Sequence, residues 1–235
     1  MNNIEFKHLI LNAKYFTKYE PIINIKTQKI FAYEALSKFE IDNNLISTEE
    51  IFRHLHHNNK LFFELEKRNK LLQIKNFPKK KKLFLNFDAD ICVSNEQQSY
   101  WELFLNELKD NIVVEITENG SDDETSANIM RNFSLWLNSK QIDTALDDFG
   151  QDGSMFSFYM MNGSKYIKID KSFLRQIECN RNYLHYLKGI LKTIRLNGQL
   201  SIIEGVETQA DYNLVKTLDC DYVQGYYFDE YQIVV

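Results

Sequence analysis

Acidic and amide side chains close a series of short apolar runs along this chain, and their types are those that hold divalent cations. The series comprises Glu34, Asn86, Glu115, Asp147, Asp148, Lys168, Glu204 and Gln224. Several ionised carboxylates cannot crowd together unless cations neutralise them. Because the set supplies hard oxygen ligands without His or Cys, it favours Mg²⁺ or Mn²⁺ over zinc.

The runs that carry these residues predict the strands of an α/β barrel. They are short and rich in β-branched and aromatic residues, and helical patterns separate most of them. Such βα units build a parallel sheet, and closure into a barrel gathers the carboxyl ends of the strands at one mouth. The chemistry-bearing residues are therefore expected around a single pocket.

The elements between these runs can be placed approximately. A first strand is expected over 19–25, and a second strand, which contains Glu34, follows the KTQK turn. One or two helices begin near Ser47, where Ser47 and Glu50 have capping-box spacing, and further helices are predicted over 97–109, 124–139, 181–197 and after Thr208. The final strand runs close to the end of the sequence, so a full closing helix is expected to be missing and another element must cover that flank.

Composition excludes several classes of protein. The chain has 235 residues, 44% of them hydrophobic, which suits a single domain over 1–235. No apolar stretch approaches a membrane helix, no secretory signal opens the sequence, and the net charge of −5 argues against affinity for duplex nucleic acid. The three widely spaced cysteines read as free thiols, so a cytoplasmic protein is expected.

Seven segments resemble, in order and spacing, the EAL domain, the bacterial phosphodiesterase that linearises cyclic di-GMP. They are YEALSKF, LFLNFD, VVEITE, ALDDFG, YIKIDKSF, IIEGVET and DYVQGYYF. The resemblance covers essentially the whole chain. It implies a modified TIM barrel with partly antiparallel early strands, two Mg²⁺ or Mn²⁺ ions, cyclic di-GMP as substrate and linear pGpG as product.

The resemblance also implies roles for individual residues. Metal ligands are expected at Glu34, Asn86, Glu115, Asp147, Asp148 and Glu204. Catalytic roles fall on Glu34, Asp148, Lys168 and Glu204. Substrate contacts are expected from Leu36, Lys38, Gln224 and Tyr226, and support of the ligands from Glu118 and Glu207. Two ions about 4 Å apart can generate hydroxide at neutral pH, while Asp148 or Glu204 takes the water proton and Lys168 offsets the developing charge.

Four departures from the family pattern, the expected lack of a closing helix among them, keep a second interpretation open. Lys38 replaces an arginine that grips a substrate phosphate, Glu20 replaces a glutamine, and the loop after Asp148 reads DFGQDGSMF. Lysine keeps the charge of arginine but loses its planar fork. The alternative is a weak or inactive EAL-like protein that acts as a cyclic di-GMP receptor or a protein-binding regulator. A homodimer and a protein partner remain open, and a glycerophosphodiesterase is disfavoured because no histidine-based pattern occurs.

Some features are better explained without chemistry. His54, His56 and His57 lie on a helical segment without a carboxylate frame, so a surface role is favoured over a metal site. Residues 79–82 form a lysine run that precedes a strand, which predicts a solvated loop on the barrel face opposite the active site. Tyr226, beside Gln224, either packs or stacks on a guanine.

Overall fold

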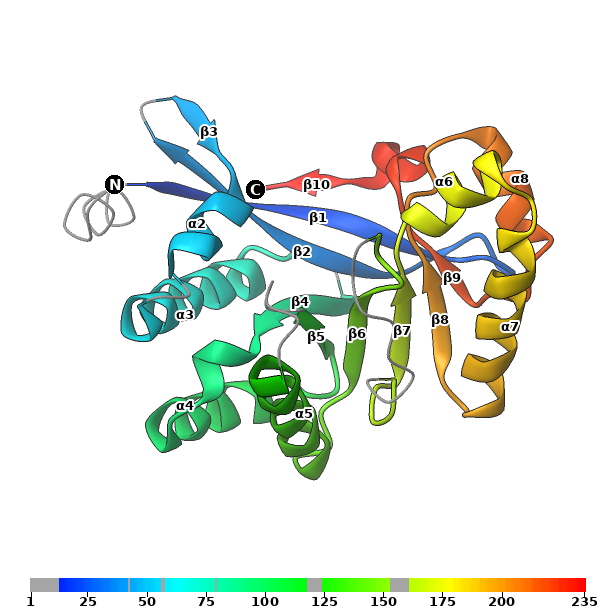
Figure 1. Cartoon of the computed structure of the whole chain (residues 1–235). Helices are drawn as coiled ribbons and strands as arrows, with labels where there is room; N and C mark the ends of the chain where they lie inside the picture. Colours follow the sequence, from blue (N-terminus) through cyan, green and yellow to red (C-terminus); the bar gives the residue numbers. More distant parts are fainter. Residues whose placement is uncertain (1–12, 42, 56–57, 79, 118–123, 153–160) are drawn as a thin grey trace.

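A closed barrel of eight strands forms the centre of the protein. The computed structural model describes residues 13–41, 43–55, 58–78, 80–117, 124–152 and 161–235. The barrel strands are β1 (Lys14–Asn24), β2 (Ile30–Ile41), β4 (Lys82–Asp88), β5 (Ile112–Thr117), β6 (Thr144–Phe149), β7 (Tyr166–Ile169), β8 (Leu200–Ile203) and β9 (Tyr222–Val223). Pairing of β1 with both β2 and β9 closes the sheet (Figure 1).

Strand β1 is antiparallel to both of its barrel neighbours, whereas β2 and β4 to β9 run parallel to one another. A short turn joins β1 to β2, and so short a connection can only link antiparallel strands. The prediction of a modified TIM barrel with part of its sheet antiparallel is therefore confirmed. Strand β1 begins earlier than expected because it pairs with β2 as far as Lys14 opposite Glu40.

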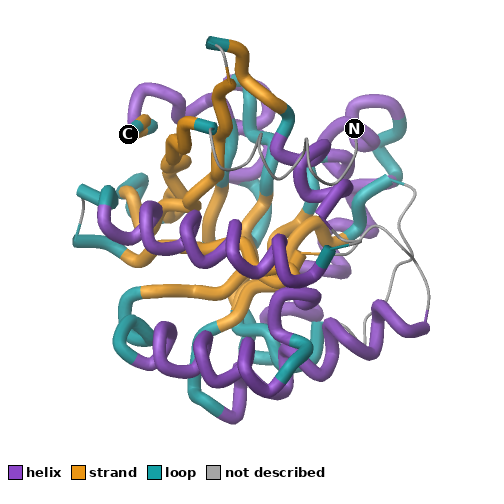
Figure 2. The backbone as a smooth tube through the Cα atoms, turned by 90° about the vertical axis from the view of Figure 1, so that its left-hand side faces the viewer, coloured by secondary structure: helices purple, strands orange, loops and turns teal. Residues whose placement is uncertain are grey.

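Helices surround the strands (Figure 2). They are α2 (Thr48–Leu55), α3 (Asn59–Lys75), α4 (Asn95–Asn106), α5 (Glu124–Ser139), α6 (Ser172–Cys179), α7 (Tyr183–Leu196) and α8 (Gln209–Lys216). The segment after Ser47 forms two helices, and Ser47 Oγ accepts the Glu50 N–H at 3.3 Å. Among the helices described, α6 was not predicted, although it buries a stripe formed by Phe173, Leu174 and Ile177. None of the described helices is long and apolar enough to cross a membrane.

The final residues of the sequence form a 3₁₀ segment and a short strand. After β9 come the 3₁₀ segment η2 (Tyr226–Tyr231) and strand β10 (Ile233–Val234). Strand β10 pairs antiparallel with β1, with Val234 opposite Lys18. The sheet thus gains a short strand beside β1, and which element covers the predicted flank stays a prediction.

An apolar plug fills the barrel on the side away from the mouth. It consists of Ile22, Ala32, Phe84, Val113, Ala145, Tyr166, Ile202 and Tyr222, with Phe31 stacked on Tyr222 at a centroid distance of 4.2 Å. Side chains alternate along a strand, so the residue two positions nearer the mouth points into the same interior. The plug therefore fixes which side chains form the next interior layer.

Gly225, which follows Gln224 at the mouth, lies close to the backbone of Val206. Its φ is +150°, and an added Cβ would lie 2.4 Å from the carbonyl oxygen and 2.5 Å from the nitrogen of Val206. Since these are backbone atoms that cannot swing aside, we expect Gly225→Ala to lower the free energy of unfolding by roughly 1–3 kcal/mol. Urea unfolding measures this change.

Gly189 provides the matched control. It lies within α7, and an added Cβ would meet nothing within 4 Å. Gly189→Ala should raise stability by about 0.5–1 kcal/mol, because alanine loses less backbone entropy than glycine in a helix. Equal effects of the two substitutions would contradict the close approach at Gly225.

Candidate metal and catalytic site

The interior layer above the plug is polar and acidic. Each strand contributes the residue two positions beyond its plug residue, so the layer contains Glu20, Glu34, Asn86, Glu115, Asp147, Lys168, Glu204 and Gln224. Glu20 belongs to it because β1 runs in the opposite direction and pairs Glu20 with Glu34. Residues far apart in the sequence thus meet in one ring.

Lys168 lies at the centre of this ring. Its Nζ contacts Glu115 Oε1 at 2.8 Å, Asp147 Oδ1 and Glu204 Oε1 at 2.9 Å, and Glu34 Oε2 at 3.1 Å. The side chain is 1% exposed. Burial lowers the pKa of Lys168, but the surrounding carboxylates outweigh it and hold the pKa well above its ordinary value. The buried ammonium therefore stays charged and neutralises part of the acidic layer.

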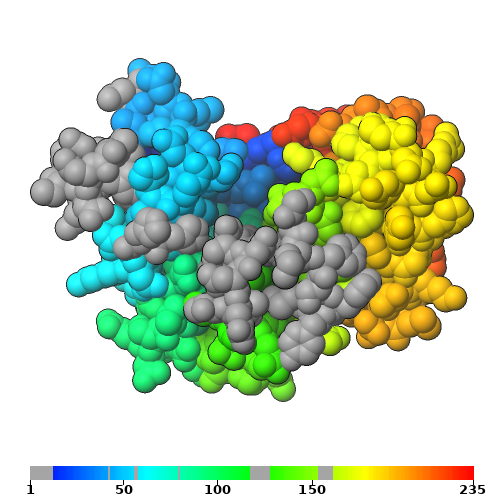
Figure 3. All heavy atoms as spheres, viewed as in Figure 1, coloured from blue at the N-terminus to red at the C-terminus, as the bar shows by residue number. Residues whose placement is uncertain are grey.

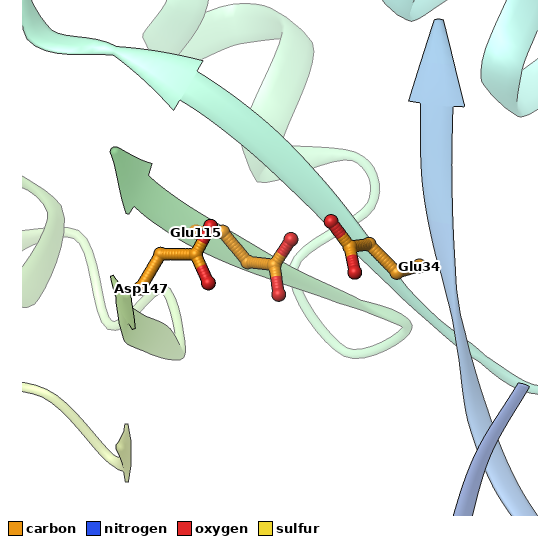
Figure 4. A group of neighbouring side chains, drawn as sticks. All are labelled: Glu34, Glu115 and Asp147. Atoms are coloured by element: carbon orange, nitrogen blue, oxygen red, sulfur yellow. The ribbon is translucent and has the colours of Figure 1, made fainter. Parts of the chain in front are cut away.

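The Glu34 carboxylate accepts hydrogen bonds from two amide side chains. Asn86 Nδ2 donates to its Oε1 at 2.7 Å and Gln224 Nε2 donates to its Oε2 at 2.6 Å. Burial alone would raise the pKa of Glu34, yet the Lys168 charge and these donors bring the pKa below its ordinary value. Glu34 is therefore ionised and faces Glu115 and Asp147 (Figure 4).

The remaining acids lack enough donors for their charge. Burial, together with neighbouring carboxylates, raises the pKa of Glu115 and Glu204 well above the ordinary value and raises that of Asp147. Both oxygens of Glu115 and Oδ1 of Asp147 are buried, and no described residue gives them a hydrogen bond of good geometry. Among the described residues, Lys168 is the one ammonium within reach of Glu115 Oε1 and Asp147 Oδ1, at 2.8 and 2.9 Å, while Glu115 Oε2 has no hydrogen-bond partner. A buried layer with more carboxylates than cationic partners is the kind of site that bound cations complete.

A bulge in β6 brings two consecutive aspartates to the same mouth. In a regular strand Asp147 and Asp148 would face opposite sides. Here the pairing of β6 with β7 shifts register between Leu146 and Phe149, and Asp148 adopts a φ of +50°. Burial and the neighbouring Asp147 raise the pKa of Asp148 to about 7. The bulge thus turns a second carboxylate, that of Asp148, toward the site. Its pKa lies near neutral pH.

Two overlapping groups of three acids have their oxygens within 4.8 Å of one another. They are Glu34, Glu115 and Asp147 in one group, and Asp147, Asp148 and Glu204 in the other. The shared Asp147 could bridge two ions. The donor set consists of carboxylates, with the amide of Asn86 alongside, so it fits hard divalent cations.

The predicted substrate-binding residues extend from this layer toward solvent. Leu36 and Lys38 follow Glu34 on the same face of β2; Leu36 is half-buried and Lys38 exposed. Gln224 lies within the layer, and the Tyr226 ring is 60% exposed at its edge. In Figure 3, atoms of the first strands are visible at the bottom of a hollow between the cyan and yellow parts of the molecule.

Other predicted residues lie apart from the cluster or outside the description. Glu207 is exposed at the start of α8, where its N–H donates to Asp211 Oδ2 at 3.1 Å. Glu118 lies outside the described residues, as do His56, His57 and Lys79. His54 is exposed on α2 and belongs to neither acidic group. The supporting roles of Glu118 and Glu207 stay predictions.

Two predictions about surface and thiol groups can be checked. Lys82 and Lys165 both contact Asp143 Oδ2 at the starts of their strands, which places the described part of the lysine run on the face opposite the acidic layer. Cys92, Cys179 and Cys220 are free, as expected.

Sequence reasoning missed Lys18 altogether and treated Glu20 only as a departure from the family. The structure brings both to the mouth, with Lys18 Nζ 2.7 Å from Glu20 Oε1. Strand alternation was the available signal, since residues 18, 20 and 22 share one face of β1.

Comparisons with known proteins agree with this geometry. The chain is 28% identical over 94% of its length to the cyclic di-GMP phosphodiesterase TpdA of Vibrio parahaemolyticus, and 23% identical over 95% to the probable cyclic di-GMP phosphodiesterase PdeN of Escherichia coli. It spans 38% and 44% of the length of these two relatives.

Solved structures show the same fold. An EAL domain protein of Listeria monocytogenes has a TM-score of 0.77 at 20% identity, covering 97% of this chain and 92% of that one. The FimX EAL domain of Pseudomonas aeruginosa, bound to c-di-GMP, has a TM-score of 0.77 at 18% identity, with 95% and 93% covered. YkuI of Bacillus subtilis, in complex with c-di-GMP and calcium, has a TM-score of 0.73 at 21% identity, with 97% and 56% covered. The family model of the EAL domain matches residues 5–231, so the chain belongs to the EAL domain family.

Proposed function

We propose that this chain is a metal-dependent phosphodiesterase that hydrolyses cyclic di-GMP to linear pGpG. The observation that carries the proposal is the buried layer in which one ammonium, that of Lys168, contacts four carboxylates. Its relatives and structural neighbours that act on or bind this nucleotide support the choice of substrate. The free cysteines accord with a reducing compartment, so we place the activity in the cytoplasm.

Two divalent ions would complete the site. On the basis of the two acidic groups, we assign Glu34 and Glu115 to one ion, Asp148 and Glu204 to the other, and Asp147 to both. We add Asn86 to the first ion because its amide contacts Glu34. Bound there, Mg²⁺ or Mn²⁺ would lower the pKa of water and stabilise the attacking and leaving oxygens.

The chain's own residues account for proton and charge handling. Asp148 and Glu204, which belong to the same acidic group, are the two candidates to accept a proton from attacking water. Lys168 keeps its charge at the centre of the layer and offsets negative charge on the phosphate oxygens. Gln224 and Asn86 hold Glu34 in one orientation through their amide groups.

Lys38 should limit substrate affinity. It lies on the same face of β2 as Glu34, but a lysine offers a single charged point where arginine offers a bidentate fork. We expect Lys38→Arg to lower KM for cyclic di-GMP by about tenfold, the value of one additional charge-assisted hydrogen bond. Steady-state kinetics measure this effect. Lys14→Arg, on the exposed Lys14–Glu40 pair, is the control and should leave KM unchanged; an equal KM for Lys38→Arg would contradict the role of Lys38.

The proposed reaction is tested by chromatography of cyclic di-GMP after incubation with the protein and Mg²⁺ or Mn²⁺. The proposal expects pGpG from the unaltered protein and none from Glu34→Ala. Nucleotide binding without any product would refute catalysis.

A cyclic di-GMP receptor is the second candidate, and it is favoured by the exposed Lys38, which lacks the bidentate fork of an arginine. Binding measured in parallel separates the two functions. A protein that neither binds nor cleaves the nucleotide would point instead to a protein-binding regulator.

A further inference from the structure

An ion pair on β1 lies at the rim of the acidic layer. Lys18 Nζ is 2.7 Å from Glu20 Oε1, and the two side chains are 20% and 16% exposed. The pair is therefore neither buried in the core nor fully on the surface. Lys18 is opposite Leu36 in the β1–β2 ladder, one step further toward solvent than Glu20 and Glu34.

The rim pair is directly connected to the proposed catalytic residues. Gln224 Nε2 donates to Glu34 Oε2 at 2.6 Å and lies 3.4 Å from Glu20 Oε2, so one amide touches both carboxylates. A nucleotide whose phosphate lies at the acidic layer would bring a neighbouring base toward this rim, because ribose joins the two.

An aromatic face lies beside the pair. Lys18 Nζ lies over one face of the Tyr226 ring, 5.3 Å from its centroid, and Tyr226 is 60% exposed, so stacking would use the other face. An exposed ring next to a charged pair can stack on a base while the pair reads the edge of that base.

The charges of Glu20 and Lys18 cancel. Glu20 alone would add negative charge to a layer that must admit an anionic substrate. Burial lowers the pKa of Lys18, but the hydrogen bond and charge of Glu20 outweigh it and raise the pKa above its ordinary value, so the ammonium is present. The pair therefore supplies a donor and an acceptor to a ligand without changing the net charge of the mouth.

We propose that Lys18 and Glu20 select guanine, with Lys18 donating to O6 and Glu20 accepting from N1–H and the N2 amino group. This inference rests on the proposed function, since it names the group that the site recognises. The Watson–Crick edge of guanine presents one acceptor followed by two donors, which matches an ammonium next to a carboxylate. Adenine presents a donor where Lys18 donates and an acceptor where Glu20 accepts, so it is rejected.

The test compares three cyclic dinucleotides by calorimetric titration in Ca²⁺. These probes are cyclic di-GMP, cyclic di-IMP, which lacks only the N2 amino group, and cyclic di-AMP. The unaltered protein should bind cyclic di-GMP roughly 5- to 150-fold more tightly than cyclic di-IMP and reject cyclic di-AMP more strongly. Equal affinity for all three would overturn the proposal without any variant.

Substitutions of Glu20 and Lys18 then test whether this pair causes the preference for guanine. Glu20→Ala should bind cyclic di-GMP and cyclic di-IMP equally, because the partner of the N2 amino group is gone. Glu40→Ala, from the Lys14–Glu40 pair of the same ladder, is the matched control and should keep the preference. Lys18→Met should weaken cyclic di-GMP more than cyclic di-AMP, since only guanine offers O6.

Three different results would each contradict a different part of the proposal. Equal losses for cyclic di-GMP and cyclic di-IMP in Glu20→Ala would make the pair structural and overturn the inference. Equal losses for all three ligands in Lys18→Met would place Lys18 on a phosphate and overturn its role at O6. An unaltered protein that binds none of the three would refute the proposed function itself.

Discussion

Lys168→Met is expected to destabilise the metal-free protein by about 3–5 kcal/mol at neutral pH. The substitution removes the buried ammonium from Glu34, Glu115, Asp147 and Glu204 while nearly preserving side-chain volume. Uncompensated buried charges carry a cost of this size. Urea unfolding in EDTA at pH 7.5 measures the loss.

Two further results should accompany this loss. Mn²⁺ should restore much of the stability, because cations replace the missing positive charge. Hydrolysis of cyclic di-GMP should nevertheless fall by roughly 10²–10³-fold, since the ions do not supply the lysine's charge at its own position.

Lys70 provides the matched control for Lys168. Its buried Nζ contacts Glu66 Oε2 at 2.6 Å on α3, away from the acidic layer. Lys70→Met should also destabilise the protein, but Mn²⁺ should not restore it. A Lys168→Met protein as stable in EDTA as the unaltered protein would contradict the central position of Lys168.

Metal binding should stabilise the protein increasingly as pH rises. Burial and neighbouring charge raise the folded-state pKa of Glu115, Asp147, Asp148 and Glu204. A raised carboxyl pKa contributes stability that is present below the unfolded value, about 4, and is lost as pH rises through the folded value, which is about 7 for Asp148. The pKa of Glu34 is lowered, so this residue alone would make the protein more stable as pH rises. The four acids whose pKa values are raised outweigh that contribution.

The metal-free protein should therefore lose stability between about pH 5 and pH 8, whereas the metal-bound protein should not. At a metal concentration of about 100 Kd the gain is about 2.7 kcal/mol, or roughly 5–10 °C in Tm for a chain of this size. Thermal denaturation in EDTA and in Mn²⁺ across this pH range measures both curves. Asp148→Asn is the control and should flatten the metal-free curve near pH 7; a metal-induced shift that is the same at pH 5.5 and pH 8 would contradict the titration described.

The sequence predicted the barrel because its strands follow from local patterns. Each short apolar run ended in a polar residue, and period-two alternation placed Glu34, Asn86, Glu115 and Lys168 on the interior face with their plug residues. The antiparallel β1 came from the resemblance, and the structure confirms it. That residues 1–235 form a single domain stays a prediction, as do the roles assigned to individual site residues.

The parts that could not be predicted depend on non-local geometry. The bulge that turns Asp148 toward the mouth arises from the register of β6 with β7, which one strand does not reveal. Lys18 and Glu20 join the site only through the reversed direction of β1 and its pairing with β2. Strand β10 is only two residues long and has no sequence signal of its own.

The most direct test of the central claim is mass spectrometry of the product formed from cyclic di-GMP in ¹⁸O-labelled water. The account predicts pGpG with a single heavy oxygen on its terminal phosphate, formed in Mn²⁺, absent in EDTA and absent in Glu34→Ala. No product in Mn²⁺, or labelled product that forms equally in EDTA, would contradict metal-dependent hydrolysis at this acidic layer.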